Sequence, residues 1–422
     1  MSETDLIIIG AGPGGYRAAE YAARQGLQVV IIEQDEVGGT CLNRGCIPTK
    51  TYVHSTTFAE AYERQQQVVS QLRAGVESIL SAPNITFLRG HAEFASTSVV
   101  TVGSNAVTAK NIIIATGSSA KMLPLPDISD SRVVTSTELL QMSTLPKRLA
   151  IIGAGVIGME FASVFQRFGS EVTVIEFLKE CLPMLDGDIA KRLRKLLEKR
   201  GITFRMKTAV QQLSDIDADV ILMATGRRPN TDGLQLEKAG IEVAPNGSIP
   251  VDDNFCVATS SAASPVGIYA IGDVNGRQML AHAAEMQAVR AVNHILGKQD
   301  GIRFDTMPSA IFTEPEAACV GPTEEQLKAA TNPDGETSGY TCRKAFWRAN
   351  GKALAMNEGE GMLKLFSDAD DRIIGCHAFG AHAADIVQEV SVLMCRDTTV
   401  SQLRDMVHIH PTLGEILHTA AE

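Results

Sequence analysis

The stretch Leu6-Ile7-Ile8-Ile9-Gly10-Ala11-Gly12-Pro13-Gly14-Gly15 decides how this chain folds. Its apolar residues end in glycine, as in a buried parallel strand, and the helix-forming residues 16–25 follow until Gly26 ends them. A second apolar run, residues 27–32, ends at Glu33. Strand, G-x-G-x-x-G loop, helix, strand and carboxylate together predict a dinucleotide-binding βαβ unit. The alternative is a tight structural turn between strand and helix.

In such a unit the glycines let the backbone approach a pyrophosphate, and the helix N-terminus faces its charge. Glu33 is then placed to accept hydrogen bonds from a ribose. The same pattern occurs a second time, where Gly153-Ala154-Gly155-Val156-Ile157-Gly158 is followed by a helix and by a strand that ends at Glu176. Residues 112–117 and 220–226 echo each other further along. The chain therefore reads as two copies of one nucleotide-binding domain, which suggests two dinucleotides, one reducing the other.

A pair of cysteines follows the first unit in Gly-Gly-Thr-Cys-Leu-Asn-Arg-Gly-Cys-Ile-Pro-Thr-Lys, residues 38–50. On an ideal helix, Cys41 and Cys46 would point roughly 140° apart, whereas a disulfide requires Cα atoms within about 7 Å. We therefore expect a distorted turn, which Gly45 and Pro48 permit, and a reversible disulfide. The thiolate is the reactive form, and a helix N-terminus or a nearby cation lowers its pKa. The alternative is two buried, inert cysteines.

The position of the cysteine pair indicates which cofactor each nucleotide-binding unit holds. The first unit abuts the cysteines, so we expect it to hold a non-dissociating redox cofactor, FAD, and the second unit to hold an exchanging nicotinamide. Glu176 favours NAD, because a carboxylate hydrogen-bonds a free 2′-hydroxyl and repels the 2′-phosphate of NADP. Lys179 is the cation nearest to Glu176 on its C-terminal side, so NADP stays open as the alternative.

The segment His-Ile-His-Pro-Thr-Leu-Gly-Glu, residues 408–415, offers a base. Pro411 restricts His410 to extended conformations, and a His bonded to a carboxylate such as Glu415 is a usual general base. His408 is the rival, since on an extended segment it points to the same side. One alternative is an ordinary surface or core histidine. Another is a zinc site made by both cysteines and both histidines, but the spacings are unusual for zinc, and we expect no metal.

Composition excludes several classes of protein. The chain has 422 residues, 45% of them apolar, and a net charge of −11, which argues against binding to nucleic acid or anionic membranes. No apolar run approaches the roughly 18 residues of a membrane span, and the N-terminus lacks a basic region, so we expect no secretory signal. Eight cysteines with one close pair suit a reducing, cytoplasmic compartment.

Weaker patterns concern the remaining elements. Residues 58–80 are polar and periodic and predict a solvated helix or a helical pair, and residues 85–88 and 98–102 alternate like small antiparallel strands. Residues 268–273 read as a buried strand that ends in Asp273. An acid at such a strand end could accept a hydrogen bond from a ribityl chain, or cap the following helix.

These motifs together resemble the pyridine nucleotide-disulfide oxidoreductases, most closely the dihydrolipoamide dehydrogenases. The resemblance covers nearly the whole chain and adds Ala-Thr-Gly-Arg-Arg-Pro-Asn, residues 224–230, and the Gly272-Asp273 pair with Met-Leu-Ala-His, residues 279–282. It implies an α/β fold with two Rossmann-like FAD- and NAD-binding domains and a C-terminal α+β dimerisation domain. The expected divisions are residues 1–120 and 248–306 for FAD, 121–247 for NAD and 307–422 for the interface.

The resemblance also implies roles. Cys41 would exchange with lipoamide and Cys46 would lie against the flavin. His410 and Glu415 would act as base in the other subunit of a homodimer, and Lys50 would sit by the flavin and pair with Glu160. The residues expected to bind FAD are Gly10, Gly12, Gly15, Glu33, Gly39, Thr40, Lys50, Ala92, Ala115, Thr116, Gly117, Asp273, Met279, Leu280, Ala281 and His282. Those expected to bind NAD are Gly153, Gly155, Val156, Ile157, Gly158, Glu176, Val210 and Gly226.

The implied activity is oxidation of the dihydrolipoyl arm of a 2-oxo acid dehydrogenase or glycine cleavage complex, with NAD as acceptor. The chain departs from the family by its short segment between Lys50 and Asn111, and by Arg44, which could lower a thiolate pKa or point to solvent. Glu176 disfavours the NADP-linked glutathione-type reductases, and the lack of a cysteine pair after Glu415 disfavours mercuric reductase. A reductase of another disulfide or electrophile, and a redox-silent structural flavoprotein, remain alternatives.

Overall fold

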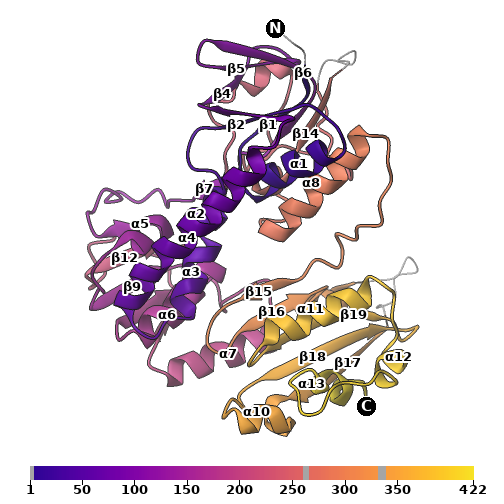
Figure 1. Ribbon diagram of the computed structural model, residues 1–422. Helices are drawn as coiled ribbons and strands as arrows, with labels where there is room; N and C mark the ends of the chain where they lie inside the picture. Colours follow the sequence, from indigo (N-terminus) through magenta and orange to yellow (C-terminus); the bar gives the residue numbers. More distant parts are fainter. Residues whose placement is uncertain (1–3, 260–265, 331–338) are drawn as a thin grey trace. The chain divides into compact units, whose positions relative to one another are not determined.

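The computed structural model describes residues 4–259, 266–330 and 339–422. Residues 1–3, which bear on the expected absence of a secretory signal, lie outside them. The chain divides into two compact units, which are described one at a time (Figure 1). Unit 1 comprises Met1–Lys121, Ser136–Ser143 and Gly226–Ile302, and unit 2 comprises Met122–Thr135, Thr144–Thr225 and Arg303–Glu422. The four-segment division expected from the sequence stays a prediction.

Unit 1 is built on a sheet with the strand order β3-β2-β1-β6-β5-β4, and β14 also pairs with β6. Its elements are β1 (Thr4–Ile9), α1 (Pro13–Arg24), β2 (Val29–Glu33), α2 (Gly39–Arg44), α3 (Cys46–Val53), α4 (Phe58–Leu80), β3 (Ile85–Arg89), β4 (Ala92–Phe94), β5 (Val99–Val102), β6 (Asn105–Ile114), β7 (Ser118–Ala120), α5 (Ser136–Gln141), β13 (Arg227–Pro229), the 3-10 helices η1 (Leu236–Ala239) and η2 (Gly272–Asn275), β14 (Gly267–Ala270) and α8 (Ala281–Ile295).

The central strands of this sheet are parallel and end at one edge. Ile9 pairs with Ile32 on one side and with Ile114 on the other, and Ile114 pairs with Ala270. The apolar runs read as buried strands are buried. Helix α1 packs against β1, β2 and α8 (Figure 1), and β4 and β5 contribute Phe94 and Val100 to the apolar core that includes Ile7 and Ile112. The loops that follow these strand ends therefore meet at the edge where open α/β sheets bind ligands.

The weaker predictions for residues 58–80, 85–88 and 98–102 have different outcomes. Residues 58–80 form one helix, α4, and not a pair; it begins where the Thr57 side chain accepts a hydrogen bond from the backbone of Glu60, and it packs against α2 and α3. Residues 98–102 do supply an antiparallel strand, β5. The prediction for residues 85–88 is wrong, because β3 is the parallel edge strand of the main sheet, paired with β2. Alternation there reflects a half-covered edge strand.

Unit 2 contains a second parallel sheet with the order β11-β10-β9-β12-β8. Its first elements are β8 (Val133–Val134), β9 (Arg148–Ile152), α6 (Val156–Arg167), β10 (Glu171–Ile175), α7 (Gly187–Lys199), β11 (Thr203–Arg205) and β12 (Val220–Met223). Strands β11, β10, β9 and β12 repeat the arrangement of β3, β2, β1 and β6 in unit 1, which confirms the internal duplication read from the sequence.

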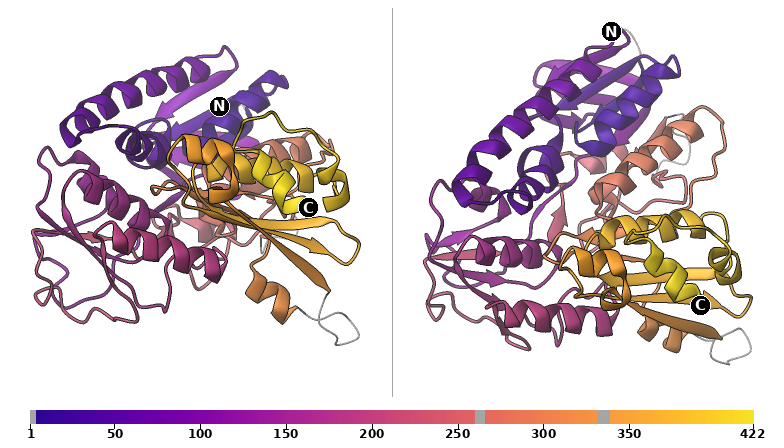
Figure 2. Two further views of the ribbon diagram at one scale, coloured as in Figure 1. Left: turned by 90° about the horizontal axis from the view of Figure 1, so that it is seen from below. Right: turned by 60° about the horizontal axis from the view of Figure 1, so that its bottom comes forward.

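The C-terminal part of unit 2 is an antiparallel sheet with the order β15-β16-β19-β18-β17. Helices α11 and α13 lie against it, and together with the buried Trp347 they close one core (Figure 2). The elements are β15 (Ser309–Ile311), β16 (Ala317–Val320), α9 (Glu324–Ala329), β17 (Tyr340–Phe346), η3 (Trp347–Ala349), α10 (Gly351–Ala355), β18 (Met362–Asp368), β19 (Ile373–Phe379), α11 (Ala383–Met394), α12 (Val400–Arg404) and α13 (Glu415–Ala421).

Among the described residues, unit 1 has a sheet whose central strands are parallel and whose strands β4 and β5 are antiparallel, together with the small antiparallel pair β13-β7. Unit 2 has one parallel and one antiparallel sheet. This arrangement confirms the predicted α/β class with a C-terminal α+β domain. Across the described residues, no helix is both long and apolar enough to cross a membrane.

Candidate active site

The two predicted redox cysteines lie on either side of a break between two short helices. Cys41 is on α2 and Cys46 begins α3, with Gly45 between them. A Cβ atom on Gly45 would lie 2.9 Å from the carbonyl oxygen of Thr40 and 3.3 Å from Cα of Cys41. The expected distortion is therefore confirmed, and it requires a residue without a side chain at the break.

The two sulfur-bearing side chains interact. Cys41 is half-buried and Cys46 is exposed. The side-chain hydrogen bond with Cys46, followed by burial, raises the pKa of Cys41, whereas Lys50 and the backbone N–H of Cys46 act to lower it. The nearby cation and helix N-terminus expected from the sequence are present, but in the reduced pair they are outweighed. Burial and the neighbouring sulfur therefore disfavour the charged form of Cys41 in the reduced pair.

Tyr16 on α1 lies in the same neighbourhood, although no motif in the sequence singled it out. Burial, then the charges of Glu285 and Cys41, raise the pKa of Tyr16 to about 12. Its hydroxyl donates a hydrogen bond of 3.4 Å to Glu285 on α8. The phenol therefore stays protonated near the thiols at neutral pH.

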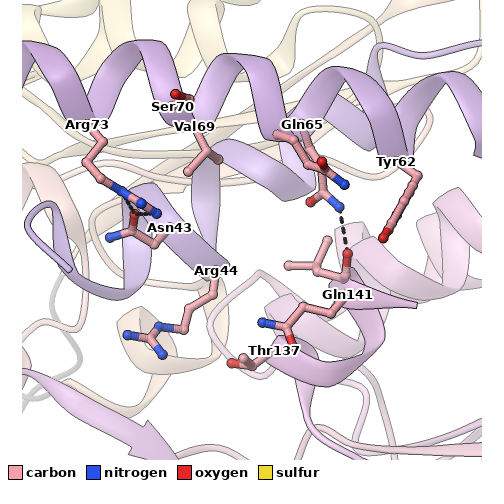
Figure 3. A pocket seen from close by; sticks show the side chains of 11 residues that line it. Asn43, Arg44, Tyr62, Gln65, Val69, Ser70, Arg73, Thr137 and Gln141 are labelled. Atoms are coloured by element: carbon pink, nitrogen blue, oxygen red, sulfur yellow. Dashed lines mark hydrogen bonds between the residues drawn. The ribbon is translucent and has the colours of Figure 1, made fainter. Parts of the chain in front are cut away.

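A polar cavity of about 270 Å³ lies next to α2, between α4 and α5 (Figure 3). Arg44 lines it and forms an ion pair with Asp35. That bond lowers the pKa of Asp35. The Arg44 side chain is 35% exposed and holds the loop that precedes the dithiol, which agrees with a partly solvated position. An effect of Arg44 on a thiolate pKa stays a prediction.

The first glycine loop closes α1 onto β1. Gly10 has a positive φ of 103°, and a Cβ atom on it would lie 2.4 Å from the carbonyl oxygen of Ala115. A Cβ atom on Gly15 would lie 1.8 Å from the oxygen of Gly10. At the end of β2, Glu33 accepts hydrogen bonds of 2.8 Å from the backbone N–H groups of Ala11 and Asp35.

The second loop repeats this geometry around α6. Gly153 has a φ of 106°, and a Cβ atom on Gly158 would lie 2.0 Å from the oxygen of Gly153. Glu176 accepts hydrogen bonds of 2.6 Å from the N–H of Ala154 and 2.7 Å from that of Leu178. Both acids thus fasten a glycine loop to the end of the second strand, in addition to the ribose contact expected of them.

The N-termini of both helices fit a pyrophosphate. The N-cap residues are Gly12 and Gly155, and among the described residues no side chain caps either helix or places an acid in its first turn. The first-turn N–H groups can therefore bind an anion. Val156 and Ile157 supply two of these groups in the second loop.

Ala115, Thr116 and Gly117 follow β6 at the same edge of the first sheet. Thr116 is held to Asn230 by two hydrogen bonds, of 2.7 Å and 3.0 Å. Ser118 donates a hydrogen bond to Asp273, and Nε of Arg227 donates to the Ser118 hydroxyl over 2.6 Å. Leu280, not Asp273, is the N-cap of α8, so the capping alternative for Asp273 is wrong.

The remaining predicted cofactor residues are dispersed. Gly39 and Thr40 lie on α2 and Lys50 on α3, while Ala92 is buried in the apolar core of unit 1. Met279, Leu280, Ala281 and His282 lead into and begin α8, in the same unit. Val210 is partly buried against the apolar core of the second sheet, and Gly226 has a positive φ of 110° between β12 and β13. Glu160 of unit 2 accepts a 2.9 Å hydrogen bond from the N–H of Phe312, and its pairing with Lys50 of unit 1 stays a prediction.

The C-terminal segment holds a histidine–carboxylate pair. Nδ1 of His410 lies 2.8 Å from Oε1 of Glu415, whose Oε2 accepts a 2.8 Å bond from the N–H of Thr412. These bonds, that of Thr412 foremost, lower the pKa of Glu415. The His410 side chain is 80% exposed. A charged carboxylate thus orients an imidazole whose other nitrogen can reach a substrate, the arrangement of a general base.

His408 has a different environment. It is 10% exposed, and its Nε2 lies 3.0 Å from Oε1 of Glu389 on α11. No motif in the sequence indicated Glu389, because a carboxylate on an amphipathic helix is an ordinary surface residue. The expectation that both histidines face one side is therefore not met, and the exposed His410 remains the better candidate base.

The comparisons with known proteins cover the whole chain. Residues 4–288 match the family described as pyridine nucleotide-disulphide oxidoreductase, and residues 307–421 match its dimerisation domain. The chain belongs to this family. It is 36% identical to the mitochondrial dihydrolipoyl dehydrogenase of Pisum sativum, over 99% of this chain and 91% of the relative. It is also 36% identical to leghemoglobin reductase of Glycine max, over 99% of this chain and 87% of that relative.

Among solved structures, the HOCl-induced flavoprotein disulfide reductase RclA from Escherichia coli, as its Cu(II) complex, superposes with a TM-score of 0.91 and 31% identity, covering 100% of this chain and 99% of that chain. The family uses FAD, NAD(H) and a disulfide redox centre, and the two open helix N-termini fit two such dinucleotides. The chain is therefore an FAD-dependent oxidoreductase of this family.

One group of carboxylates among the described residues has the spacing of a metal site, namely Asp186, Asp188 and Glu324 in unit 2. Nζ of Lys364, 1% exposed, donates to Asp186 over 2.7 Å and to Glu324. His377 accepts a 3.0 Å bond from the N–H of Asp186. An ammonium group thus supplies the positive charge in this cluster, which the sequence did not reveal.

Proposed function

We propose that this protein is a dihydrolipoyl dehydrogenase, which oxidises a protein-bound dihydrolipoyl group through the Cys41–Cys46 pair and FAD, with NAD as acceptor. The observation that carries the proposal is the combination of a hydrogen-bonded thiol pair at a helix break with a His410–Glu415 pair at the C-terminus. The identity of 36% to a dihydrolipoyl dehydrogenase along almost the whole chain supports it.

In this reaction His410 removes a proton from one substrate thiol. The resulting thiolate attacks Sγ of Cys41, the Cys41–Cys46 bond breaks, and Cys46 leaves as a thiolate. The second substrate thiol then attacks the substrate sulfur of the mixed disulfide, and its proton passes to Cys41, which leaves as a thiol. Lipoamide is released, and the pair is reduced by two electrons, with the first proton still on His410. Glu415 stabilises the imidazolium that forms on His410. FAD, held at the first glycine loop, supplies the two-electron relay to NAD at the second.

The base would act across a homodimer. Two side chains that flank His408, Val407 and Ile409, are 97% and 79% exposed, which is unusual for apolar residues. They lie within the region that matches the family's dimerisation domain. A second copy of the chain covering this segment would bury them and bring His410 to the dithiol of its partner. The lipoyl carrier of a 2-oxo acid dehydrogenase or glycine cleavage complex is the proposed electron donor.

The deciding experiment is a steady-state assay of the purified flavoprotein with dihydrolipoamide, and with NAD or NADP as acceptor. We expect turnover with NAD and a strong preference over NADP, because Glu176 opposes a 2′-phosphate. Cys46→Ser should keep its flavin and lose turnover, whereas Cys181→Ser, which removes a buried thiol in unit 2, should keep both. Unchanged turnover in Cys46→Ser would refute the mechanism.

A second candidate is NAD(P)H-dependent reduction of another disulfide or electrophile. The 31% identity and TM-score of 0.91 to a flavoprotein disulfide reductase favour it. Here the electrons would run from the nicotinamide to the cysteine pair and out to the acceptor. Comparing kcat/KM for dihydrolipoamide oxidation with that for NADH-driven reduction of lipoamide and of unrelated disulfides separates the two. A clear preference for an unrelated disulfide would displace the first proposal.

A further inference from the structure

Asn43 is the residue that connects the dithiol helix to its surroundings. It lies on α2 between the two cysteines, and its Nδ2 donates hydrogen bonds of 2.9 Å to the carbonyl oxygens of Val37 and Gly39. Its Oδ1 accepts two bonds from Arg73 of α4, of 3.0 Å from Nε and 2.8 Å from Nη2 (Figure 3). The side-chain amide is thus engaged on both of its ends.

The contacts at both ends of this amide favour one orientation. If the amide were flipped, its NH2 group would face a guanidinium, which can only donate, and its oxygen would face two carbonyl oxygens, which can only accept. The forked bond from Arg73 is charge-assisted and therefore stronger than the bonds to the neutral carbonyl groups. Arg73 thus reinforces the orientation in which Asn43 binds the turn and holds the amide in place.

The turn that Asn43 binds is the one from which the dithiol helix starts. Gly38 and Gly39 both have positive φ, 94° and 59°, and a Cβ atom on Gly39 would lie 2.7 Å from Cα of Gly12 in the first nucleotide loop. Nη1 of Arg73 also lies 3.6 Å from Glu36, just before this turn. One guanidinium on the long helix α4 thus holds both the turn and the first dithiol helix.

We propose that Arg73 is a positioning residue for the redox pair: through Asn43 it holds the turn at residues 36–39 and the start of α2, so that Cys41 stays in bonding position opposite Cys46. This deepens the proposed function, because it concerns the same dithiol. Its consequence is a more stable disulfide, since two thiols held in place close their bond with a higher effective concentration.

The test measures the disulfide itself and needs neither substrate nor nicotinamide. The purified holoprotein is equilibrated without oxygen in mixtures of reduced and oxidised dithiothreitol, quenched with acid and alkylated, and the Cys41–Cys46 disulfide is counted by mass. Each disulfide reduced consumes one dithiothreitol and yields one oxidised dithiothreitol. We expect Arg73→Met to become reduced at a ratio of reduced to oxidised dithiothreitol roughly 3 to 10 times lower than the wild type does.

Four further variants isolate the cause. Arg64→Met removes another arginine of α4, which bonds the carbonyl of His54, and should leave the ratio unchanged. Asn43→Ala should shift it in the same direction as Arg73→Met, and the double variant should shift no further, because Arg73 acts through Asn43. Arg73→Lys keeps a single charged donor for Asn43 without the fork, and should shift the ratio part of the way.

Two results would overturn the proposal: a shift below twofold in Arg73→Met, or a double variant whose shift is the product of the two single shifts. Thermal melting and flavin absorbance report whether each variant is folded and loaded. If Arg73→Met does not fold, the comparison of Arg73→Lys with the wild type and with Asn43→Ala decides the outcome. Absence of dihydrolipoamide turnover in the wild type would refute the proposed substrate and leave this measurement unaffected.

Discussion

Replacing Lys364 by methionine should destabilise unit 2 strongly. The ammonium group lies on β18, 1% exposed, between the carboxylates of Asp186 and Glu324. Methionine fills similar volume and removes the positive charge. The substitution thus leaves Asp186, whose side chain is 2% exposed, as a buried carboxylate without a cation. Removing one partner of a buried ion pair typically costs about 3–5 kcal/mol.

The contacts of Asp186 and Glu324 indicate that the loss of unfolding free energy in Lys364→Met is near the lower end of that range. Asp186 keeps hydrogen bonds of 3.1 Å from the N–H groups of Asp188 and Glu324, which stabilise its charge. Glu324 is more exposed, at 21%, so water can solvate it when the lysine is gone. We therefore expect a loss of about 3 kcal/mol, a large part of the roughly 5–15 kcal/mol that holds a domain folded.

The assay is urea unfolding followed by fluorescence. The chain has one tryptophan, Trp347, which is fully buried in the core that includes Leu363 and Leu365, neighbours of Lys364 on β18. Its emission therefore reports this unit. Lys328→Met is the matched control: Lys328 lies 2.9 Å from the same Glu324 but is 61% exposed, so its loss should leave the midpoint unchanged. Asp186→Asn combined with Lys364→Met should recover part of the loss. A midpoint in Lys364→Met equal to that of the control would refute the argument.

Three other outcomes follow from the contacts. Hydrogen bonds from Lys364 and then Lys328 lower the pKa of Glu324 to about 2 from 4.5. The stability that Glu324 contributes is therefore present above pH 4.5 and is lost as the pH falls towards 2. Acid unfolding monitored by Trp347 fluorescence should show this loss of stability, and Glu324→Gln should flatten it. Glu415→Gln should lower kcat for dihydrolipoamide oxidation by about 10²-fold or more and alter its pH profile; an unaltered profile would exclude Glu415 from the base. Gly158→Ala should weaken NADH binding at least tenfold in a fluorescence titration while flavin content stays normal, because its Cβ would meet the Gly153 oxygen; an unchanged dissociation constant would contradict the site.

The nucleotide loops could be predicted because their signal is local. Gly10, Gly15 and Glu33 stand at fixed spacings within one βαβ unit, and each has a steric or hydrogen-bonding reason that depends on its own neighbours. The same holds for the break at Gly45, which follows from the distance that a disulfide requires. His410 and Glu415 are close enough in sequence for their pairing to be expected.

The residues that were missed act over long sequence distances. Arg73 reaches Asn43 from a helix whose polar composition indicated only a solvated surface. Lys364 lies on β18 of the antiparallel sheet, whereas Asp186 is the N-cap residue of α7, and a charged residue on a strand reads as exposed until its partner is known. The parallel pairing of β3 with β2 depends on the crossover through α4, which alternation of polarity cannot reveal.

The near identity of the two glycine loops has a consequence for ligand choice. Each is closed by the same contact between its third and first glycine, and by the same hydrogen bond from the N–H of the alanine that follows the first glycine to a carboxylate. Two loops with the same backbone geometry do not by themselves favour a flavin dinucleotide over a nicotinamide dinucleotide. Discrimination must therefore reside in the segments that differ, such as Asp273 with its Ser118 and Arg227 partners near one loop, and the residues after Glu176 near the other. Exchanging the two hexapeptides should leave each cofactor in its own domain.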